Sequence, residues 1–344
     1  MCVRYFESCV ARWIFAALML GAIAGCGSHI LLGAFDEDAG APDAPGARPD
    51  GAATADTGAP SDSGISELCT DYANQFCAVE QSCNILFFRN TWWGDAAVCR
   101  ERRKIRCELR LSAPGSNDTA ARVSTCMSTL AKLSCDAYTD LESWLDNCEV
   151  PPGNLADGAP CGEAAQCRGG GCFPPDNSLC GVCSTLSPLG APCNASCLST
   201  LQCINGTCVA FLREGDACRF GGPLCAFGLA CIGAGSGQGK CGKRLGIGVA
   251  CDPSAFECND SQGLSCDGAT SRCQMDPGFP APGASCRVGQ LCRADAWCNM
   301  STNRCEAKRR EGEACGNAAA SAVCLPPATC VGSVCTLPNP SGCR

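Results

Sequence analysis

Cysteine is the feature that most constrains what this chain can fold into. The sequence has 37 cysteines in 344 residues, a density typical of disulfide scaffolds. Thiols at this density form stable disulfides in an oxidising compartment outside the cytosol. The chain also has 40 glycines and 21 prolines, and aromatic residues make up only 6%. We therefore expect several small disulfide-rich units rather than one large apolar core.

Beyond residue 153 the cysteines recur in register, as tandem repeats do. Each of six units opens with a glycine, two further residues and a cysteine, and the glycines are Gly158, Gly190, Gly215, Gly248, Gly283 and Gly312. Within the region 154–343 we delimit the repeats as 154–183, 188–208, 213–241, 246–273, 281–305 and 310–343.

Five of the repeats contain the same set of four cysteines. These are Cys193, Cys197, Cys203 and Cys208; Cys218, Cys225, Cys231 and Cys241; Cys251, Cys258, Cys266 and Cys273; Cys286, Cys292, Cys298 and Cys305; and Cys315, Cys324, Cys330 and Cys335. The first repeat has five, Cys161, Cys167, Cys172, Cys180 and Cys183, and Cys343 follows the sixth.

Each repeat is predicted to form a small β-hairpin knot. The last two cysteines bracket a turn, most clearly around Asn205-Gly206, a pair typical of two-residue hairpins. Four cysteines allow three pairings, and we expect first to third and second to fourth. The two surplus cysteines, Cys183 and Cys343, either pair with each other or leave Cys343 free or intermolecular.

Residues 66–150 are predicted to form a four-helix domain with eight cysteines. Its first helix has Leu68, Tyr72, Phe76, Val79 and Cys83 on one face. Asp95 is expected to cap a second helix that ends near Leu111, and Asp118 a third with Val123, Met127, Leu130 and Leu133 inward. Thr139 to Glu142 resembles a capping box for a fourth. The cysteines are Cys69, Cys77, Cys83, Cys99, Cys107, Cys126, Cys135 and Cys148, an even number that indicates four internal bridges.

The second predicted helix is strongly basic, with Arg100, Arg102, Arg103, Lys104, Arg106 and Arg110. Such a cluster either binds an anionic partner or forms a solvated helix face, and we favour the solvated face. Trp92 and Trp93 precede it, and we favour an anchoring role in the core over a partner-binding tip.

The N-terminus is typical of a secreted lipoprotein. Residues 1–25 combine two arginines with a short apolar run and small residues, the pattern of a signal peptide. Ile23 to Cys26 resembles a bacterial lipobox, which implies cleavage before Cys26 and lipid attachment to its sulfur. Gly27 follows, in place of the aspartate of inner-membrane retention, so we expect the outer membrane or cell surface. Residues 26–65, rich in Ala, Gly, Pro and Asp, are predicted to be a disordered tether.

The parity of the cysteines agrees with this interpretation. Cys2 and Cys9 leave with the signal peptide and Cys26 is acylated, so 34 cysteines remain, an even number that permits complete pairing.

The cysteine spacing of the first repeat, from Cys161 to Cys183 and on to Cys193, resembles the N-terminal cysteine-rich domain of Dickkopf proteins. The region 154–343 as a whole resembles bacterial cysteine-rich repeat lipoproteins whose repeats match that domain. The resemblance implies an extracellular, disulfide-bonded interaction module.

The sequence offers little for catalysis, cofactors or metals. The one histidine, His29, lies three residues beyond Cys26. Cys180 and Cys183 have CxxC spacing, but their setting favours structural pairing over redox or zinc chemistry. The net charge of −8 argues against nucleic acid. We expect a non-catalytic surface lipoprotein that binds an extracellular protein or polysaccharide, or stabilises the envelope. The alternative is an inhibitor or enzyme-associated module that presents rigid loops.

Overall fold

The computed structural model describes residues 62–139, 147–175, 178–193, 196–219, 221–287, 291–315 and 323–343. The predicted signal peptide, Cys26 and the tether up to residue 61 lie outside these residues. The first helix begins at Asp62, four residues inside the predicted tether. Acidic residues are favourable in the first turn of a helix, since they face the positive end of its dipole.

The N-terminal part is helical. Its elements are α2 (Asp62–Cys83), α3 (Ile85–Phe87), the π-helical η1 (Phe88–Trp92), α4 (Ala96–Ser112), α5 (Ala120–Leu130) and α6 (Cys135–Thr139). The two predicted inward faces, of α2 and α5, are confirmed, because Tyr72, Phe76, Val123 and Leu130 are buried in one core with Leu68, Val79 and Met127 packed against it. The predicted cap of the second helix is also confirmed, since the Val98 N–H donates to Asp95 Oδ1 at 2.9 Å.

The structure differs from the predicted helices in two details. Thr119, not Asp118, caps α5, because the Arg122 N–H donates to Thr119 Oγ1 at 3.2 Å. The Asp118 carboxylate is instead engaged by two arginines, Arg110 and Arg122. Most of the predicted fourth helix, residues 140–146, lies outside the described residues, and the short α6 before it was not predicted.

The eight cysteines of the helical part pair only with one another. The disulfides are Cys69–Cys107, Cys77–Cys99, Cys83–Cys135 and Cys126–Cys148. They join α2 to α4 twice, α2 to α6 once, and α5 to the chain that leads into the repeats. These bridges stabilise a core too small to be stable from apolar burial alone.

Each repeat contains one small antiparallel sheet. The strands are β1 (Pro160–Cys161), β2 (Gly170–Phe173), β3 (Gly181–Thr185), β4 (Leu201–Ile204), β5 (Thr207–Ala210), β6 (Ala217–Cys218), β7 (Leu229–Ile232), β8 (Gly239–Lys243), β9 (Leu264–Asp267), β10 (Arg272–Met275), β11 (Ala296–Asn299), β12 (Arg304–Ala307), β13 (Thr329–Val331) and β14 (Val334–Thr336). Repeats 1 and 3 have three strands, in the orders β1-β3-β2 and β6-β8-β7, and the others are two-stranded hairpins. Short 3-10 turns accompany them: η2 (Ala164–Gln166), η3 (Ala234–Ser236), η4 (Asp260–Gln262) and η5 (Pro340–Gly342).

Two disulfides cross in every repeat. Repeats 2 to 6 pair first to third and second to fourth, as predicted. In each hairpin the last two cysteines face each other in register, as Cys203 and Cys208 do, but each is bonded to a cysteine outside the hairpin. The crossed pair therefore fixes the preceding loop against the hairpin.

The recurring glycine has a specific conformational role. In all six repeats its φ lies between 77° and 89°, and in all six a Cβ added there would meet nothing within 4 Å. A hydrogen bond of 3.0–3.3 Å closes each turn, and the glycine N–H donates at 2.7–2.8 Å to the carbonyl of the last cysteine of its repeat. This geometry is that of a type II turn, which requires positive φ at its third residue. The glycine is thus selected by backbone conformation and not by crowding.

One disulfide closes the chain of repeats on itself. Cys180 pairs with Cys343, 163 residues later. The prediction that Cys183 is the surplus cysteine was wrong: Cys183 takes the fourth position of repeat 1 and pairs with Cys167. Cys183 lies directly across β2–β3 from Cys172, the place that the fourth cysteine occupies in every other repeat. The register of the hairpin therefore selects Cys183 and leaves Cys180 for closure.

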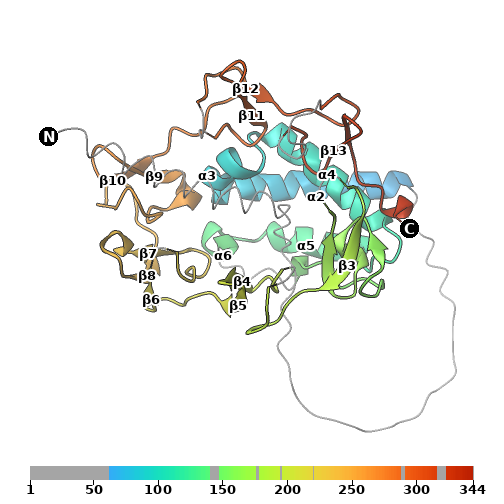
Figure 1. Cartoon of the computed structure of the whole chain (residues 1–344), viewed down its shortest axis with the longest axis horizontal. Helices are drawn as coiled ribbons and strands as arrows, with labels where there is room; N and C mark the ends of the chain where they lie inside the picture. Colours follow the sequence, from blue (N-terminus) through green and yellow to red (C-terminus); the bar gives the residue numbers. More distant parts are fainter. Residues whose placement is uncertain are drawn as a thin grey trace, which may run out of the picture.

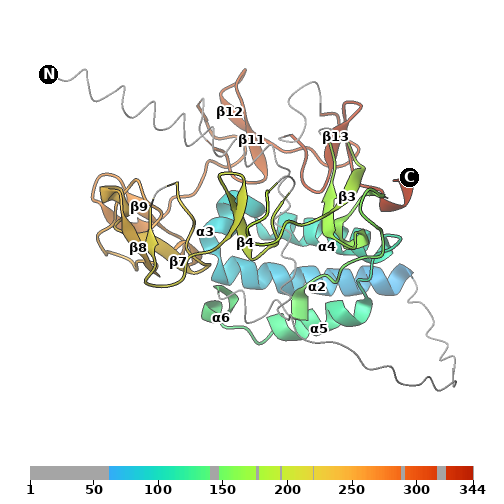
Figure 2. The same cartoon turned by 60° about the horizontal axis from the view of Figure 1, so that its bottom comes forward.

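The repeats follow one another around the helical part. Figure 1 shows them in sequence from β3 past β4–β5, β6–β8, β9–β10 and β11–β12 to β13, which returns beside β3. In the turned view of Figure 2, β3, β4 and β11–β13 lie on one side of the long helix α2, and α5 and α6 on the other. The closed set of repeats therefore covers one side of the helices.

The conformational role of the turn glycine can be tested with two matched variants in repeat 4. Gly248→Ala is expected to destabilise the repeat by about 1–2 kcal/mol, the cost of a left-handed backbone for an L side chain. Gly246→Ala is the control, because it lies in the same turn, has equally open space around it and lacks a positive φ. Amide exchange measures the effect at Val249, whose N–H closes this turn, and at Cys273, whose N–H donates to the Val249 carbonyl. Equal acceleration in both variants would contradict the assignment.

Candidate functional site

The basic helix α4 is one of the places where the repeats contact the helical part. The expectation of a solvated basic face was wrong, because Arg102 is fully buried and Arg103, Lys104, Arg106 and Arg110 are half-buried. Of the six predicted cluster residues, only Arg100 is exposed. The reason is long-range: acidic and polar groups of repeats 1, 5 and 6 approach the helix from sequence positions far away.

Repeat 6 contacts the middle of α4 through a four-residue charge network. Arg102 donates to Glu311 at 2.5 Å and to Glu101 at 2.6 Å, and Glu101 also pairs with Arg310. Arg310 and Glu311 are the first two residues of the glycine turn of this repeat. Because the Arg102 side chain has no solvent exposure, its charge depends on these two carboxylates.

Repeat 5 contacts the start of α4. Arg293 forms a bidentate pair with Asp295 at 2.8 and 2.6 Å, and its guanidinium lies 3.9 Å from Asp95, the cap of α4. Gly94 makes the approach possible, since a Cβ there would lie 2.6 Å from Asp295 Oδ1. Repeat 5 therefore adds a cation beside the residue that caps the helix.

Repeat 1 contacts the end of α4 through Gln166, which is 2% exposed. Its side-chain N–H donates to the Pro114 carbonyl at 2.8 Å, and its oxygen accepts from the Gly162 and Glu163 N–H groups at 2.7 and 3.0 Å. The same amide nitrogen lies 3.5 Å from the Pro340 carbonyl. Gln166 thus joins three segments, the loop after α4, repeat 1 and the C-terminal segment.

Glu163 adds an electrostatic contact at the same place. Burial raises the pKa of Glu163, and the nearby positive charges of Arg106 and Arg110 oppose that rise. Burial likewise lowers the pKa of Arg106, and Glu163 opposes it. Each group therefore offsets part of the effect of burial on the pKa of the other.

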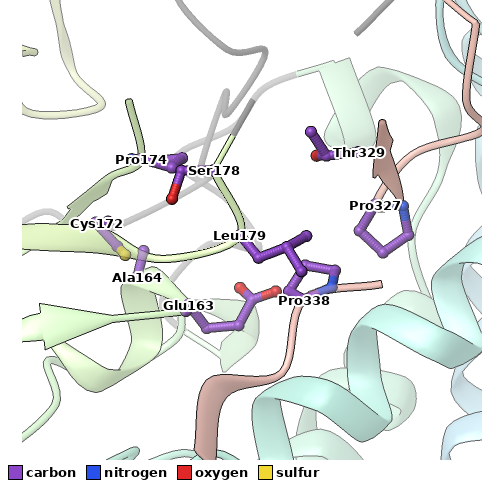
Figure 3. A pocket seen from close by; sticks show the side chains of 11 residues that line it. Glu163, Ala164, Cys172, Pro174, Ser178, Leu179, Pro327, Thr329 and Pro338 are labelled. Atoms are coloured by element: carbon purple, nitrogen blue, oxygen red, sulfur yellow. The ribbon is translucent and has the colours of Figure 1, made fainter. Parts of the chain in front are cut away.

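A small cavity adjoins Glu163, between repeat 1 and repeat 6. Figure 3 shows the Glu163 carboxylate beside Leu179 and Pro338. The cavity measures about 60 Å³, room for a few water molecules and far below the several hundred Å³ of organic ligand sites. The cavity is therefore a small space at the contact between the two repeats and not a ligand site.

Arg103 turns inward, toward aromatic rings and a buried acid. Its guanidinium lies 3.8 Å from the centre of the Phe76 ring and 5.1 Å from that of Trp93. Trp93 is 5% exposed and packs with Phe88, so the predicted anchoring role is confirmed for this tryptophan. Burial raises the pKa of Glu80, with Arg103 and a hydrogen bond from Tyr138 opposing the rise.

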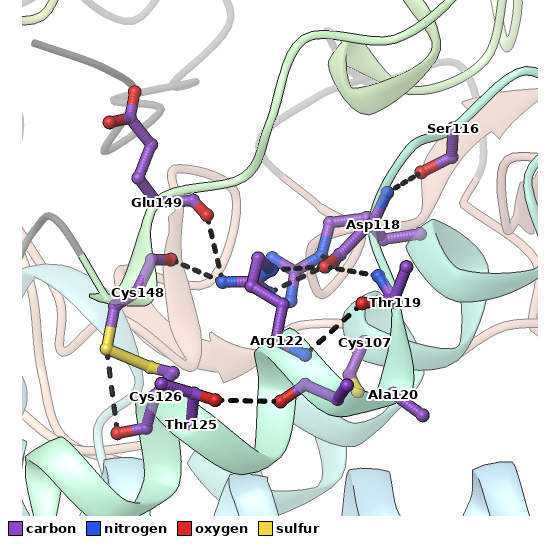
Figure 4. A network of polar contacts seen from close by, with 12 residues as sticks. Cys107, Ser116, Asp118, Thr119, Ala120, Arg122, Thr125, Cys126, Cys148 and Glu149 are labelled. Carbon is purple, nitrogen blue, oxygen red and sulfur yellow. Dashed lines mark hydrogen bonds and ion pairs between the residues drawn. A yellow bond between two sulfur atoms is a disulfide. The ribbon is translucent and has the colours of Figure 1, made fainter. Parts of the chain in front are cut away.

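A second network holds the chain where it leaves the helices. Arg122 donates to the carbonyls of Cys148 and Glu149 at 2.7 and 3.0 Å while pairing with Asp118 (Figure 4). Asp118 also pairs with Arg110 of α4. The network connects α4, α5 and the segment that enters repeat 1.

The described cysteines are all in disulfides. Cys180 and Cys183 bond to different partners, Cys343 and Cys167, so they form no CxxC disulfide with each other. In most repeats three sulfurs lie within 4.8 Å of one another, for example those of Cys286, Cys292 and Cys305. These sulfurs belong to disulfides, and thiolate ligation of a metal would require their reduction.

No family model, no curated protein and no solved structure matches this chain. Within the ranges that the structure describes, none of the helices has the length and apolar character to cross a bilayer.

The charge network at repeat 6 can be tested with two equivalent residues. Glu311→Gln removes one partner of the buried Arg102 and is expected to cost about 2 kcal/mol, below the full value for a buried pair because Glu311 is partly exposed. Glu214→Gln is the control, since Glu214 precedes the turn glycine of repeat 3 and is exposed; its expected effect is under about 0.5 kcal/mol. Chemical denaturation with intact disulfides measures both, and similar losses would contradict the role of Glu311.

The buried Glu80 is expected to make the stability of the fold depend on pH. The raised pKa means that folded Glu80 binds its proton more tightly than the unfolded chain does. Its contribution therefore favours folding at low pH and is lost as the pH rises through the folded-state pKa. Glu80→Gln is expected to gain stability relative to the wild type between about pH 4 and about pH 7. Thermal unfolding across this range measures it, with the exposed Glu67→Gln as control. Parallel curves for wild type and Glu80→Gln would refute the argument.

Proposed function

We propose that this chain is a lipid-anchored bacterial surface protein without catalytic activity, which acts in recognition, adhesion or envelope structure. The observation that carries the proposal is the complete pairing of 34 cysteines in 17 disulfides. Such a molecule requires an oxidising compartment. Of the cysteines outside the predicted signal peptide, the pairing omits only Cys26, which the lipobox assigns to lipid.

The charges of α4 support an architectural role for the helical part. A cluster that suggested an anionic partner contacts repeats 6 and 1 instead, through Arg102 and Arg106. Repeats 1, 5 and 6 are in this way held against the helical part, which the predicted tether would join to the predicted anchor. We propose that the protein is displayed outside the cell, as the resemblance to cysteine-rich repeat lipoproteins implies.

The alternative, an inhibitor that presents a rigid loop, draws support from Phe256. This side chain is 87% exposed between Cys251 and Cys258. However, the next residue, Glu257, is 3% exposed, and its carboxylate accepts from Gly233 and Asp252 N–H groups at 2.6 and 2.9 Å. A protease cleft takes up residues on both sides of an exposed anchor, so this buried neighbour favours recognition over inhibition.

Mass spectrometry of the protein purified from its host envelope tests the proposal. The expected N-terminus is Cys26 carrying a diacylglyceryl group, and Cys26→Ser is expected to lose membrane association. Thiol titration of the denatured, unreduced protein is expected to find no free thiol. An intact Met1, or an unmodified N-terminus elsewhere, would remove the anchor from the proposal. More than one or two free thiols would contradict the expectation that all 34 cysteines are paired.

A further inference from the structure

Three of the disulfides have no buried cysteine, whereas every other bridge in the described residues has at least one. These three are Cys180–Cys343, Cys193–Cys203 and Cys251–Cys266. The rate of thiol–disulfide exchange depends on access to the sulfur that is attacked. These bridges are therefore the ones that a reductant in solution can reach without prior opening of the fold.

Two of the three bridges lie inside a repeat. They join cysteines 10 and 15 residues apart, and in each repeat a second bridge crosses them. Thiols kept together in this way have a high effective concentration for one another, so a reduced bridge re-forms readily. Cys180 and Cys343 differ, because they are 163 residues apart. Among the described cysteines, no second bridge joins the C-terminal segment to repeat 1.

Repeat 1 holds the Cys180 end of this bridge. The Ser178 hydroxyl donates to the Cys180 carbonyl at 2.7 Å and accepts from the Cys180 N–H at 3.2 Å. The next residue, Gly181, begins β3, and that strand contains Cys183, which is bonded to Cys167. The hairpin of repeat 1 therefore keeps its own attachments when Cys180 is not bonded.

The Cys343 end has few other contacts with repeat 1. We define residues 337–343, which follow β14, as the C-terminal arm. Pro340 of the arm is buried, and a Cβ added to Gly162 of repeat 1 would lie 2.7 Å from its Cα. The Pro340 carbonyl lies 3.5 Å from the Gln166 amide nitrogen. Within the part of the chain that the structure describes, no backbone hydrogen bond joins the arm to repeat 1. The disulfide is therefore the main attachment of the arm to that repeat.

We propose that Cys180–Cys343 is a redox latch, which a dithiol opens to free the C-terminal arm from repeat 1 while each repeat keeps its own two bridges. One thiolate of the dithiol attacks a sulfur of the latch, breaks the Cys180–Cys343 bond and forms a mixed disulfide. The second sulfur of the dithiol then displaces the cysteine, so that the dithiol becomes a disulfide. Two electrons and two protons pass from the dithiol to the two cysteines. The proposal does not depend on the lipid anchor.

Opening the latch alters the place where repeat 1 contacts the end of α4. Pro340 lies against Gly162, whose N–H donates to Gln166 Oε1 at 2.7 Å. Pro338 of the arm lines the small cavity beside Glu163 (Figure 3). Without the arm, both places gain access to water. The latch therefore controls how closely repeat 1 and the C-terminal arm enclose this contact.

Stepwise reduction tests the order of opening. The chain from residue 26 onward, carrying Cys26→Ser so that no unpaired cysteine is present, is exposed to rising concentrations of dithiothreitol, alkylated and mapped by mass spectrometry. Cys180 and Cys343 are expected to be alkylated at a concentration at least about tenfold below that needed for the two accessible bridges inside repeats. Those bridges are the matched controls, because neither of their cysteines is buried. Reduction of either control bridge before the latch, or together with it, would overturn the proposal.

Amide exchange tests what the open latch releases. In the partly reduced parent, and in Cys180→Ser/Cys343→Ser without reductant, the Gly162 and Glu163 N–H groups are expected to exchange at least about tenfold faster. The Cys208 N–H, which is bonded within repeat 2, is expected to be unchanged. Thiol titration shows whether the variant has formed its other bridges, and the partly reduced parent gives the same measurement without these substitutions. Unchanged exchange at Gly162 and Glu163 in the opened protein would also overturn the proposal.

Discussion

Two crossed disulfides and one left-handed glycine organise each repeat, and the rest of the molecule depends on them. A unit of about thirty residues buries too little apolar surface to fold alone. The disulfides limit the unfolded ensemble, and loops of 10 to 16 residues are short enough for each bridge to contribute roughly 3 kcal/mol in a chain-entropy model. The glycine turn then reverses the chain, so that the N–H and C=O groups of the last cysteine both form hydrogen bonds with the turn. With the interior occupied by sulfur, the side chains between cysteines are free to vary.

That freedom explains how one repeated scaffold meets different surroundings. The residue before the turn glycine is Glu311 in repeat 6, where it neutralises the buried Arg102, and Ile247 in repeat 4, where it is 68% exposed. The residue before the second cysteine is Gln166 where three segments meet and Leu224 where the surface is open. The turn has the same backbone conformation in all six repeats, so the side chain before the glycine can differ without disturbing the turn.

Much of the fold could be predicted from local spacing. The repeated glycines, the pairing within repeats, the inward faces of α2 and α5, and the Asp95 cap all follow from short-range periodicity. The role of α4 could not be predicted, because Glu311 is 209 residues from Arg102 and no local pattern links them. The prediction that Cys183 is the surplus cysteine of repeat 1 was wrong for a related reason. Cys180 and Cys183 are only three residues apart, and the strand register alone shows that Cys183 takes the fourth position of the repeat. Asp118 resembled a cap because it directly precedes a helix. Its true partners, Arg110 of α4 and Arg122 of α5, could not be recognised from the residues next to it.

The Cys180–Cys343 bond has a consequence for how the protein responds to proteolysis. Peptide cleavage normally separates the two sides of a linker once the local structure opens. Here any single cut between residues 180 and 343 leaves both sides joined, through the remaining chain in one direction and the Cys180–Cys343 bridge in the other. The repeats would stay attached to one another and to the helices. Cleavage would nick the molecule without releasing any part of it, and a second cut in a different linker would be needed before a repeat could separate from the rest.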